Sequence, residues 1–391
     1  FPTRRSSDLF GLGDGYFVSA SVLHSDRREA LVWRNLAFDR PDLDFARGVA
    51  PDGRPIYPDL GDIPLQSDPA NTDGNENTNG AEISLPDAFV IDTTEGGTTT
   101  AYAFQLAKQY ESGLGFRFGY TYTDAEDLLE YTSSRAVSAW RGIIGTDRNN
   151  PIVGTSSNEI QHKFTVNLNY ERDFVRDLTS RFNVFGLIQS GQPFSYGFDV
   201  SGGNPIFGRA LGGSPRDGAD LLYIPEAGGD PRVEFETAAD EAAFNAFVPA
   251  QGLEEFRGSF VPRNSDRSPW SQRWDFRFTQ DLPGIPGAER FVGENRFQFV
   301  LDIENFPNLL NEDWGTQYRR GGSFGRVSTV DVDLRELAGG EILSDNEPGE
   351  FCKAAGDCRY VYSDVVNLDD IQSRDLNNSV YRVRVGLRYE F

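Results

Sequence analysis

The chain has 391 residues and a formal net charge of −23, from 37 Lys and Arg against 60 Asp and Glu. This charge balance argues against nucleic acids and anionic membrane surfaces as electrostatic partners. No stretch approaches the ~20 consecutive apolar residues that a membrane-spanning helix needs, which excludes helical spanning. The composition is compatible with a transmembrane β-barrel, because only every second strand residue of a barrel meets lipid.

The opening "FPTRRSSDLF" resembles a translated sequencing adapter, and the chain contains no Met. Residues 1–9 are therefore expected to be a non-native leader and are excluded from the fold prediction.

Alternation of apolar and polar residues recurs along the rest of the chain and predicts β-strands. In "EIQHKFTVNLNYE" the residues from Ile160 to Tyr170 at even positions are apolar or aromatic, and the intervening residues are polar. In chain order the predicted strands cover residues 15–25, 30–39, 85–93, 98–110, 114–123, 160–170, 178–190, 252–261, 270–280, 295–305, 314–335 and 381–391. We therefore predict an all-β fold, an antiparallel transmembrane β-barrel of which about 12 strands are present.

Alternate residues of a strand form two sets, called its apolar and its polar parity below, and the two sets differ in chemistry. The apolar parity is rich in aromatic residues, which suits a lipid-facing band and its interfacial girdles, and the polar parity carries charges that suit a wet lumen. A soluble β-sandwich or propeller also alternates, but its apolar parity is mostly aliphatic. The predicted lumen-facing residues are Arg117, Lys163, Arg273, Asp275, Arg277, Asp302, Glu304, Arg382, Arg384 and Arg388. They either line a solute path or grip an inserted plug, or they pair with one another across neighbouring strands.

Long polar segments at about 40–84, 125–158, 191–251 and 336–377 are predicted loops, and a helix is predicted over 237–250 inside one of them. Tight turns are predicted at 110–113 and 171–177. Residues 68–80 offer oxygen ligands for calcium, but they lack the spacing of an EF-hand loop, so a solvated loop is the preferred interpretation.

Few residues point to metal or catalytic chemistry. The two cysteines, Cys352 and Cys358, are six apart, and this spacing predicts a small disulfide loop in an oxidising compartment. The two histidines, His24 and His162, both lie in predicted strands, which disfavours a multi-His metal site and a Ser-His-Asp hydrolase. No enzyme activity, cofactor or metal is predicted.

Two sets of motifs carry a family resemblance. The C-terminal residues Tyr381, Val383, Val385, Leu387, Tyr389 and Phe391 resemble the insertion signal of outer-membrane barrels. The segments "GYTYTDAEDLLEYTSSRAVSAW" (119–140), "SGQPFSY" (190–196), "ADLLYIP" (219–225), "RN" before "PW" (263–270), "DFRFTQDLPG" (275–284) and "DIENFPNLLNEDWG" (302–315) are similar to the C-terminal barrel of Oar-like TonB-dependent receptors.

The resemblance implies that residues 10–391 are the C-terminal part of a ~22-stranded transporter barrel that takes up a large solute. It also implies a plug and a TonB-contacting segment in a preceding part of the protein, and a periplasmic turn at Asn308–Asn311. The expected location is the outer membrane of a Gram-negative bacterium. The expected partners are outer-membrane lipid, the barrel-insertion machinery, the TonB machinery and an unidentified solute, and nucleic acid is not expected. The alternative is an outer-membrane adhesion or surface-interaction barrel that does not transport.

Overall fold

The computed structural model describes residues 3–11, 13–36, 48–57, 88–128, 133–175, 177–199, 207, 218–287, 289–292, 295–320, 325–343, 351–366 and 371–391. Strands dominate these ranges, and the longest helix is α2 (Ala238–Ala250). Among the helices of these ranges, none is long and apolar enough to cross a membrane.

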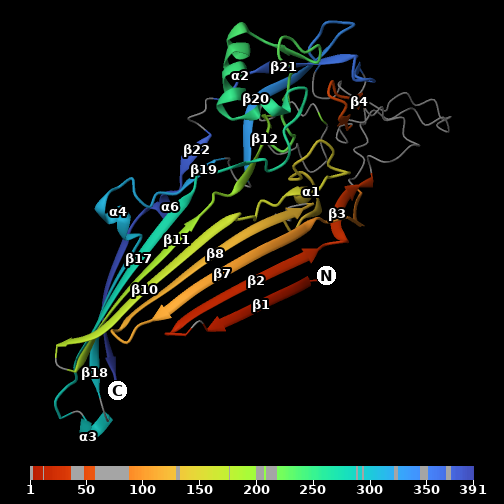
Figure 1. Cartoon of the computed structure of the whole chain (residues 1–391). Helices are drawn as coiled ribbons and strands as arrows, with labels where there is room; N and C mark the ends of the chain where they lie inside the picture. The colour runs from red at the N-terminus through yellow and green to blue at the C-terminus, as the bar shows by residue number, and fades with distance from the viewer. Residues whose placement is uncertain are drawn as a thin grey trace, which may run out of the picture.

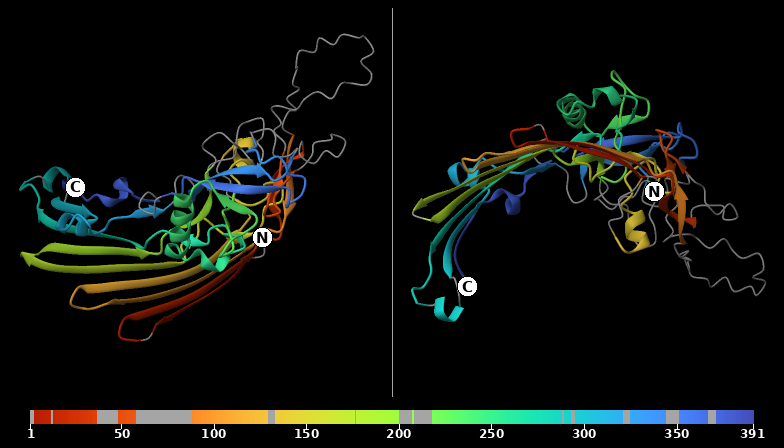
Figure 2. Two further views of the ribbon diagram at one scale, coloured as in Figure 1. Left: turned by 90° about the horizontal axis from the view of Figure 1, so that it is seen from above. Right: turned by 60° about the horizontal axis from the view of Figure 1, so that its bottom comes forward.

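One large antiparallel sheet, called the wall below, runs through the molecule (Figure 1). Its strands are, in spatial order, β1 (Thr3–Gly11), β2 (Tyr16–Asp26), β7 (Thr98–Gln109), β8 (Leu114–Asp127), β10 (His162–Val175), β11 (Leu178–Gln189), β17 (Ser271–Pro283), β18 (Arg296–Glu304) and β23 (Arg382–Glu390), and the short β9 (Gly154–Thr155) pairs with β8. All neighbours along this path are antiparallel, which confirms the predicted architecture. Figure 2 shows that the wall curves without closing, and β1 and β23 have no second neighbour within the described ranges.

The register of the wall gives it two continuous faces. On one face, Val166 of β10 lies opposite Phe118 of β8 and Gly186 of β11. The same face continues to β23, where Leu301 lies opposite Val385. Because each residue of an antiparallel ladder shares its face with its partner, the apolar parities of the separate strands join into one apolar surface.

The wall has short turns at one end and long connections at the other (Figure 1). The turn between β7 and β8 is tight because Gly113 adopts a φ of +89° and its carbonyl oxygen accepts a hydrogen bond from the Glu171 amide. A Cβ on Gly113 would lie 1.9 Å from the carbonyl oxygen of Glu171, so glycine is required there. The β17–β18 connection at the same end carries the short helix α3 (Glu289–Val292).

Four predicted strands lie outside the wall and β1 was not predicted, so the wall has nine strands along its path where about 12 were predicted. The segments 30–39 and 85–93 form β3 (Ala30–Asn35) and β6 (Phe89–Thr94), which pair with each other beyond the long-loop end of β2 and β7. The prediction for 252–261 was wrong, because this segment holds a 3₁₀ helix (Leu253–Phe256) and the two-residue β15 (Ser259–Phe260).

The predicted strand over 314–335 also lies outside the wall. It divides into β19 (Tyr318–Arg320), which pairs with β22 (Gln372–Arg374), and β20 (Arg326–Glu336). In β20, Val327, Val330, Val332 and Leu334 are all buried. Burial on both sides makes β20 an interior strand of a packed layer, not a strand with one wet face.

A second layer, called the loop body below, packs at the long-loop end of the wall (Figure 1). Its five-stranded sheet has the order β14 (Val233–Phe235), β21 (Cys358–Ser363), β20, β12 (Pro193–Asp199) and β16 (Asp266–Arg267). Its other elements are α2, the 3₁₀ helix, β4 (Gly48–Val49), β5 (Pro55–Ile56), β13 (Tyr223–Ile224) and β15. Their side chains form one buried hydrophobic cluster.

The helix predicted over 237–250 is confirmed as α2. It begins with a capping box, in which the Thr237 hydroxyl accepts from the Asp240 amide and the Asp240 carboxylate accepts from the Thr237 amide. Phe244 and Phe247 then point from one helix face into the core of the loop body. Three short helices complete the described structure: α1 (Ala136–Trp140), α4 (Phe306–Leu310) and α6 (Leu376–Ser379).

The first strand includes most of the expected leader. β1 pairs with β2 from Thr3 opposite Ser25 to Gly11 opposite Phe17. Backbone pairing is available to almost any sequence, so it does not identify the origin of these residues. The non-native origin of 1–9 therefore stays a prediction.

The same substitution at adjacent positions of β10 should lower the unfolding free energy by different amounts, because the two side chains lie on different faces of the wall. We expect Val166→Arg to destabilise the protein in lipid vesicles by about 2–4 kcal/mol, because the arginine would face the bilayer midplane. Asn167→Arg, on the other face of the same strand, should cost under about 1 kcal/mol. Urea unfolding of both variants in vesicles measures the difference. Equal costs would contradict the assignment of the faces.

Candidate solute path along the wall and loop body

All ten predicted lumen-facing residues lie on one face of the wall, called the polar face below. The register links them strand by strand: Arg117 lies opposite Asn167, Asn183 lies opposite Arg277, and Asp302 lies opposite Arg384. Lys163, Arg273, Asp275, Glu304, Arg382 and Arg388 share these parities on β10, β17, β18 and β23. The structure therefore brings the whole predicted set onto one surface, and whether that surface faces a lumen stays a prediction.

Most of these charges pair across neighbouring strands. Arg277 of β17 lies 2.8 Å from Asp302 of β18, while Arg273 lies 2.9 Å from Asp275 on its own strand. Glu304 contacts three guanidinium groups, those of Arg273, Arg382 and Arg384. The pairs leave the guanidinium groups accessible, since the side chain of Arg384 keeps 65% of its exposure. Such exposed pairs contribute little to stability, so they remain available to a charged solute or segment.

Two residues of the set have no ion-pair partner among the described residues. Arg117 and Lys163 are exposed, and neither forms an ion pair with any described residue. Arg117 instead lines a hollow of about 420 Å³ on the polar face.

The hollow combines aromatic rings with polar side chains. Phe17 of β2 and Phe185 of β11 are 52% and 38% exposed there. Gln109, Asn167 and Asn169 supply amide groups to the same hollow. A surface of this composition offers both apolar contact and hydrogen bonds to a solute or a peptide segment.

Neither phenylalanine was among the predicted lumen-facing residues. Each interrupts the alternation, because each is a large aromatic residue on the polar parity of its strand. That interruption is the signal that identifies them.

A buried ion pair holds together three chain segments of the loop body. The Arg54 guanidinium lies 2.6 Å from the Asp52 carboxylate and donates to the Leu221 carbonyl oxygen at 2.7 Å. The Tyr360 hydroxyl donates to the same carboxylate at 2.9 Å. The guanidinium also stacks over the Phe198 ring, 5.3 Å from its centroid. Segments 48–57, 193–199, 218–222 and 358–363 therefore meet at one charge pair.

This environment shifts the pKa of each group at the pair. Burial acts to raise the pKa of the Asp52 carboxyl, but the Arg54 guanidinium outweighs it and holds that pKa below its ordinary value. Burial raises the pKa of the Tyr360 phenol well above its ordinary value. Asp52 is therefore ionised and Tyr360 is neutral at physiological pH.

A second buried contact lies beside the first. The Arg148 guanidinium pairs with the Asp220 carboxylate, and both side chains are almost fully buried. Asp220 stands in "ADLLYIP", one of the segments that carry the family resemblance. The pair joins the segment that follows α1 to the segment that precedes β13.

The "RN" motif connects the loop body to the wall. Arg263 donates to the Asp127 carboxylate at 2.7 Å and to the Gly154 carbonyl oxygen at 3.0 Å, at the end of β8. Asn264 adopts a φ of +56°, and its amide nitrogen donates to the Ser195 hydroxyl in β12 at 2.9 Å. The motif thus fixes the loop body at the rim of the wall.

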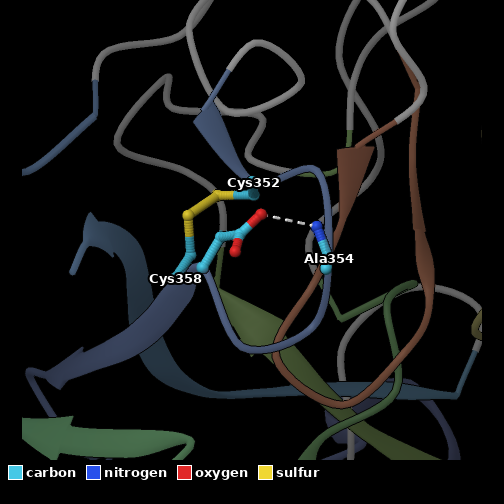
Figure 3. The surroundings of a disulfide bond; sticks show 4 residues. Cys352, Ala354 and Cys358 are labelled. Carbon is cyan, nitrogen blue, oxygen red and sulfur yellow. Dashed lines mark hydrogen bonds between the residues drawn. A yellow bond between two sulfur atoms is a disulfide. The ribbon is translucent and has the colours of Figure 1, made fainter. Parts of the chain in front are cut away.

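The two cysteines form a disulfide in the loop body (Figure 3). Their Cα atoms are 5.4 Å apart, and the Asp357 carboxylate accepts a hydrogen bond from the Ala354 amide inside the closed loop. The Val49 amide donates to the Cys352 carbonyl oxygen at 2.7 Å. The disulfide loop therefore holds the edge of β4.

The histidines lie on the apolar face of the wall. His162 stacks on Trp270, with ring centroids 5.8 Å apart, and lies 2.9 Å from the Tyr120 hydroxyl. The His24 ring lies 2.9 Å from the Thr100 hydroxyl. Within the part of the chain that the structure describes, no three His, Cys, Asp or Glu side chains cluster as a metal site. Residues 68–80, the candidate calcium loop, lie outside the described ranges.

One turn prediction was wrong. The segment Asn308–Asn311 follows β18 at the long-loop end of the wall, opposite the short turns, and not in a periplasmic turn. The chain reverses there through α4, which folds back beside β17 because Asn305 adopts a left-handed conformation with a φ of +50°.

Four residues of the predicted insertion signal, Val383, Val385, Leu387 and Tyr389, lie in β23, and Tyr381 and Phe391 flank it. Its apolar residues line the apolar face, and Val385 is 67% exposed. Tyr389 packs against Phe297 of β18, with ring centroids 4.8 Å apart.

A family model described as an outer membrane beta barrel domain matches residues 58–337. No curated protein and no solved structure matches the chain.

The Arg54–Asp52 pair predicts a large loss of stability in the loop body. Arg54→Met should cost about 3–5 kcal/mol, because it leaves the Asp52 carboxylate buried without its partner. The control Arg359→Met removes a half-exposed pair with Glu234 and should cost under about 1 kcal/mol. Denaturant unfolding followed by near-UV circular dichroism measures both. Similar losses would show that the buried pair does not hold the loop body together.

The lowered pKa of Asp52 predicts a loss of stability in acid. Its contribution is present above the unfolded pKa of ~3.9 and disappears as the pH falls through the lower folded pKa. Between pH 6 and pH 3 the unfolding free energy should therefore fall more steeply in the wild type than in Asp52→Asn. Asp230, whose pKa is also lowered, leaves a residual slope in the variant. Parallel pH profiles would contradict the assignment.

Proposed function

The chain belongs to the family of outer membrane beta-barrel domains, and from that premise we propose that it acts in a TonB-dependent receptor that imports a large solute. The protein is located in the outer membrane. Its apolar face meets lipid, because in hydrocarbon only a continuous strand ladder satisfies every backbone group.

One observation carries the proposal: a polar face bearing accessible arginines runs along the wall, and a packed loop body sits over its long-loop end. Long loops of outer-membrane barrels lie on the extracellular side. The loop body has its own hydrophobic core, so its surface is formed before a ligand arrives. A preformed surface binds a solute without a large cost for ordering loops.

Transport then requires a path from the loop body along the wall. The accessible guanidinium groups and the hollow at Phe17 and Phe185 lie on the face that such a path would follow. In the proposed mechanism the loop body captures the solute, and energy delivered by the TonB machinery moves a plug away from the polar face. No step of this cycle involves covalent chemistry or a cofactor.

The topology supports a larger barrel. Without β1, which lies largely in the expected leader, the wall path contains eight strands, so β2 and β23 run in opposite directions. Antiparallel closure between them needs an even number of further strands, and a ~22-stranded barrel meets this condition. We propose that residues 10–391 form the C-terminal part of such a barrel, and that β23 is also recognised by the barrel-insertion machinery.

The proposal predicts uptake that needs both this protein and an energised inner membrane. Cells with the intact gene and cells lacking it are compared for uptake of labelled siderophores, oligosaccharides and peptides. At least one solute should enter only with the gene, and a protonophore should abolish its entry while leaving surface binding. Arg54→Met should reduce both binding and uptake, because it disrupts the loop body.

Two results would overturn the proposal. Gene-dependent binding with no gene-dependent uptake would identify an adhesion barrel. Uptake that persists with the protonophore would identify a passive pore.

A further inference from the structure

A second hollow lies on the outside of the wall, on the apolar face. Its volume is about 280 Å³, and its lining residues are Gln272, Trp274, Phe306, Pro307, Leu310 and Trp314. The first two belong to β17, and the others belong to α4 and the segment after it. Figure 1 shows α4 beside β17 at the long-loop end.

The register fixes the side of the wall on which this hollow opens. Trp274 lies opposite Gly186, which lies opposite Val166 on the apolar face. A Cβ on Gly186 would lie 2.4 Å from the Trp274 ring, so the indole covers the glycine. The hollow is therefore continuous with the apolar face that lipid covers.

Hydrogen bonds hold the α4 segment in place. The Asn305 amide nitrogen donates to the Asp275 carboxylate at 2.8 Å, and its side-chain amide donates to the Gly315 carbonyl oxygen at 3.0 Å. The Asn308 side chain donates to the carbonyl oxygens of Glu312 and Trp314. The rim of the hollow is thus a loop held in one conformation by the hydrogen bonds of two asparagines.

The side chains at the mouth are apolar and uncovered. Leu310 is 69% exposed and Trp314 is 53% exposed. Asn311, Glu312 and Asp313 lie between them in sequence and are exposed. The segment therefore has an apolar side toward the wall and polar residues at its tip, as expected where hydrocarbon meets the headgroup region.

We propose that this hollow binds one acyl chain of an outer-leaflet lipid. Three observations select this occupant: the hollow opens on the lipid-facing side, it lies at the extracellular end of the wall, and its lining is almost entirely apolar. Lipid at this position covers Leu310 and Trp314, and the polar tip stays at the headgroup level. The inference depends on the location in the outer membrane and not on TonB-dependent transport.

Photo-crosslinking tests the proposal directly. The full chain is reconstituted in phosphatidylcholine vesicles that contain a phospholipid with a diazirine in the middle of one acyl chain. After irradiation, mass spectrometry locates the lipid adducts. Adducts at Phe306, Leu310 and Trp314 should exceed those at Val385 severalfold, because a retained chain stays at the site while lipid on the open wall exchanges.

A matched pair of variants separates the hollow from general lipid contact. Leu310→Glu should lower adducts in the hollow roughly tenfold or more, because a carboxylate is expelled from hydrocarbon. Leu376→Glu, at the same end of the wall and 67% exposed, should leave them unchanged. Adducts at Val385 confirm insertion of both variants.

Three outcomes would overturn the proposal. Adducts in the hollow at or below the level at Val385 would show that no chain is retained. Crosslinks to a second copy from a photoreactive amino acid placed at position 310 would show that another protein chain covers the hollow. Equal losses in both variants would show that the effect is not specific to the hollow.

Discussion

The structure depends on one constraint, the pairing of backbone groups along a continuous antiparallel ladder. In hydrocarbon an unpaired amide or carbonyl costs several kcal/mol, so a strand is tolerated there only with neighbours. The ladder fixes the register, and the register assigns every side chain of the wall to one of two faces. The lipid band, the charged polar face and the outer hollow beside α4 all follow from that assignment.

The loop body obeys a different constraint. Its strands are buried from both sides by aromatic and aliphatic residues, as in a soluble domain. The buried Arg54–Asp52 pair is hydrogen-bonded to Leu221 and Tyr360, and the loop closed by the Cys352–Cys358 disulfide is hydrogen-bonded to Val49, so segments far apart in the chain are connected. Hydrogen bonds of Arg263 and Asn264 join the wall to the loop body, so this short motif fixes the position of the loop body relative to the wall. This division suits the proposed receptor, since a rigid wall in the membrane would present a preformed surface outside it.

The sequence predicted the wall well because one face of each wall strand is wet and the other is apolar. This alternation located eight of the nine strands of the path to within a few residues, and the ninth, β1, lies largely in the segment set aside as a leader. The same logic could not place β20, because its Val330, Val332 and Leu334 alternate with polar residues as in a wall strand but are buried in the loop body. Helix α2 was predictable, since its capping residues are local in sequence.

The candidate site was predictable in part for the same reason. Charged residues on the polar parity could be placed on one face, but their partners could not, because the partners depend on which strands are neighbours. Phe17 and Phe185 are visible in the sequence only as aromatic residues that interrupt the alternation of apolar and polar residues. The end of the wall at which α4 lies follows from the direction of β18, and its return beside β17 depends on the left-handed conformation of Asn305; neither is visible in the local sequence pattern.

The most direct measurement of the central claim is a spin-label scan along β10 in lipid vesicles. The described residues contain no free cysteine, so single cysteines introduced from 163 to 169 can be labelled selectively. Our account predicts collision rates that alternate residue by residue, with oxygen favoured at 164, 166 and 168 and a water-soluble nickel complex favoured at 163, 165, 167 and 169. Uniformly low access to both reagents would mean that β10 lies between two packed protein layers, and it would contradict the account.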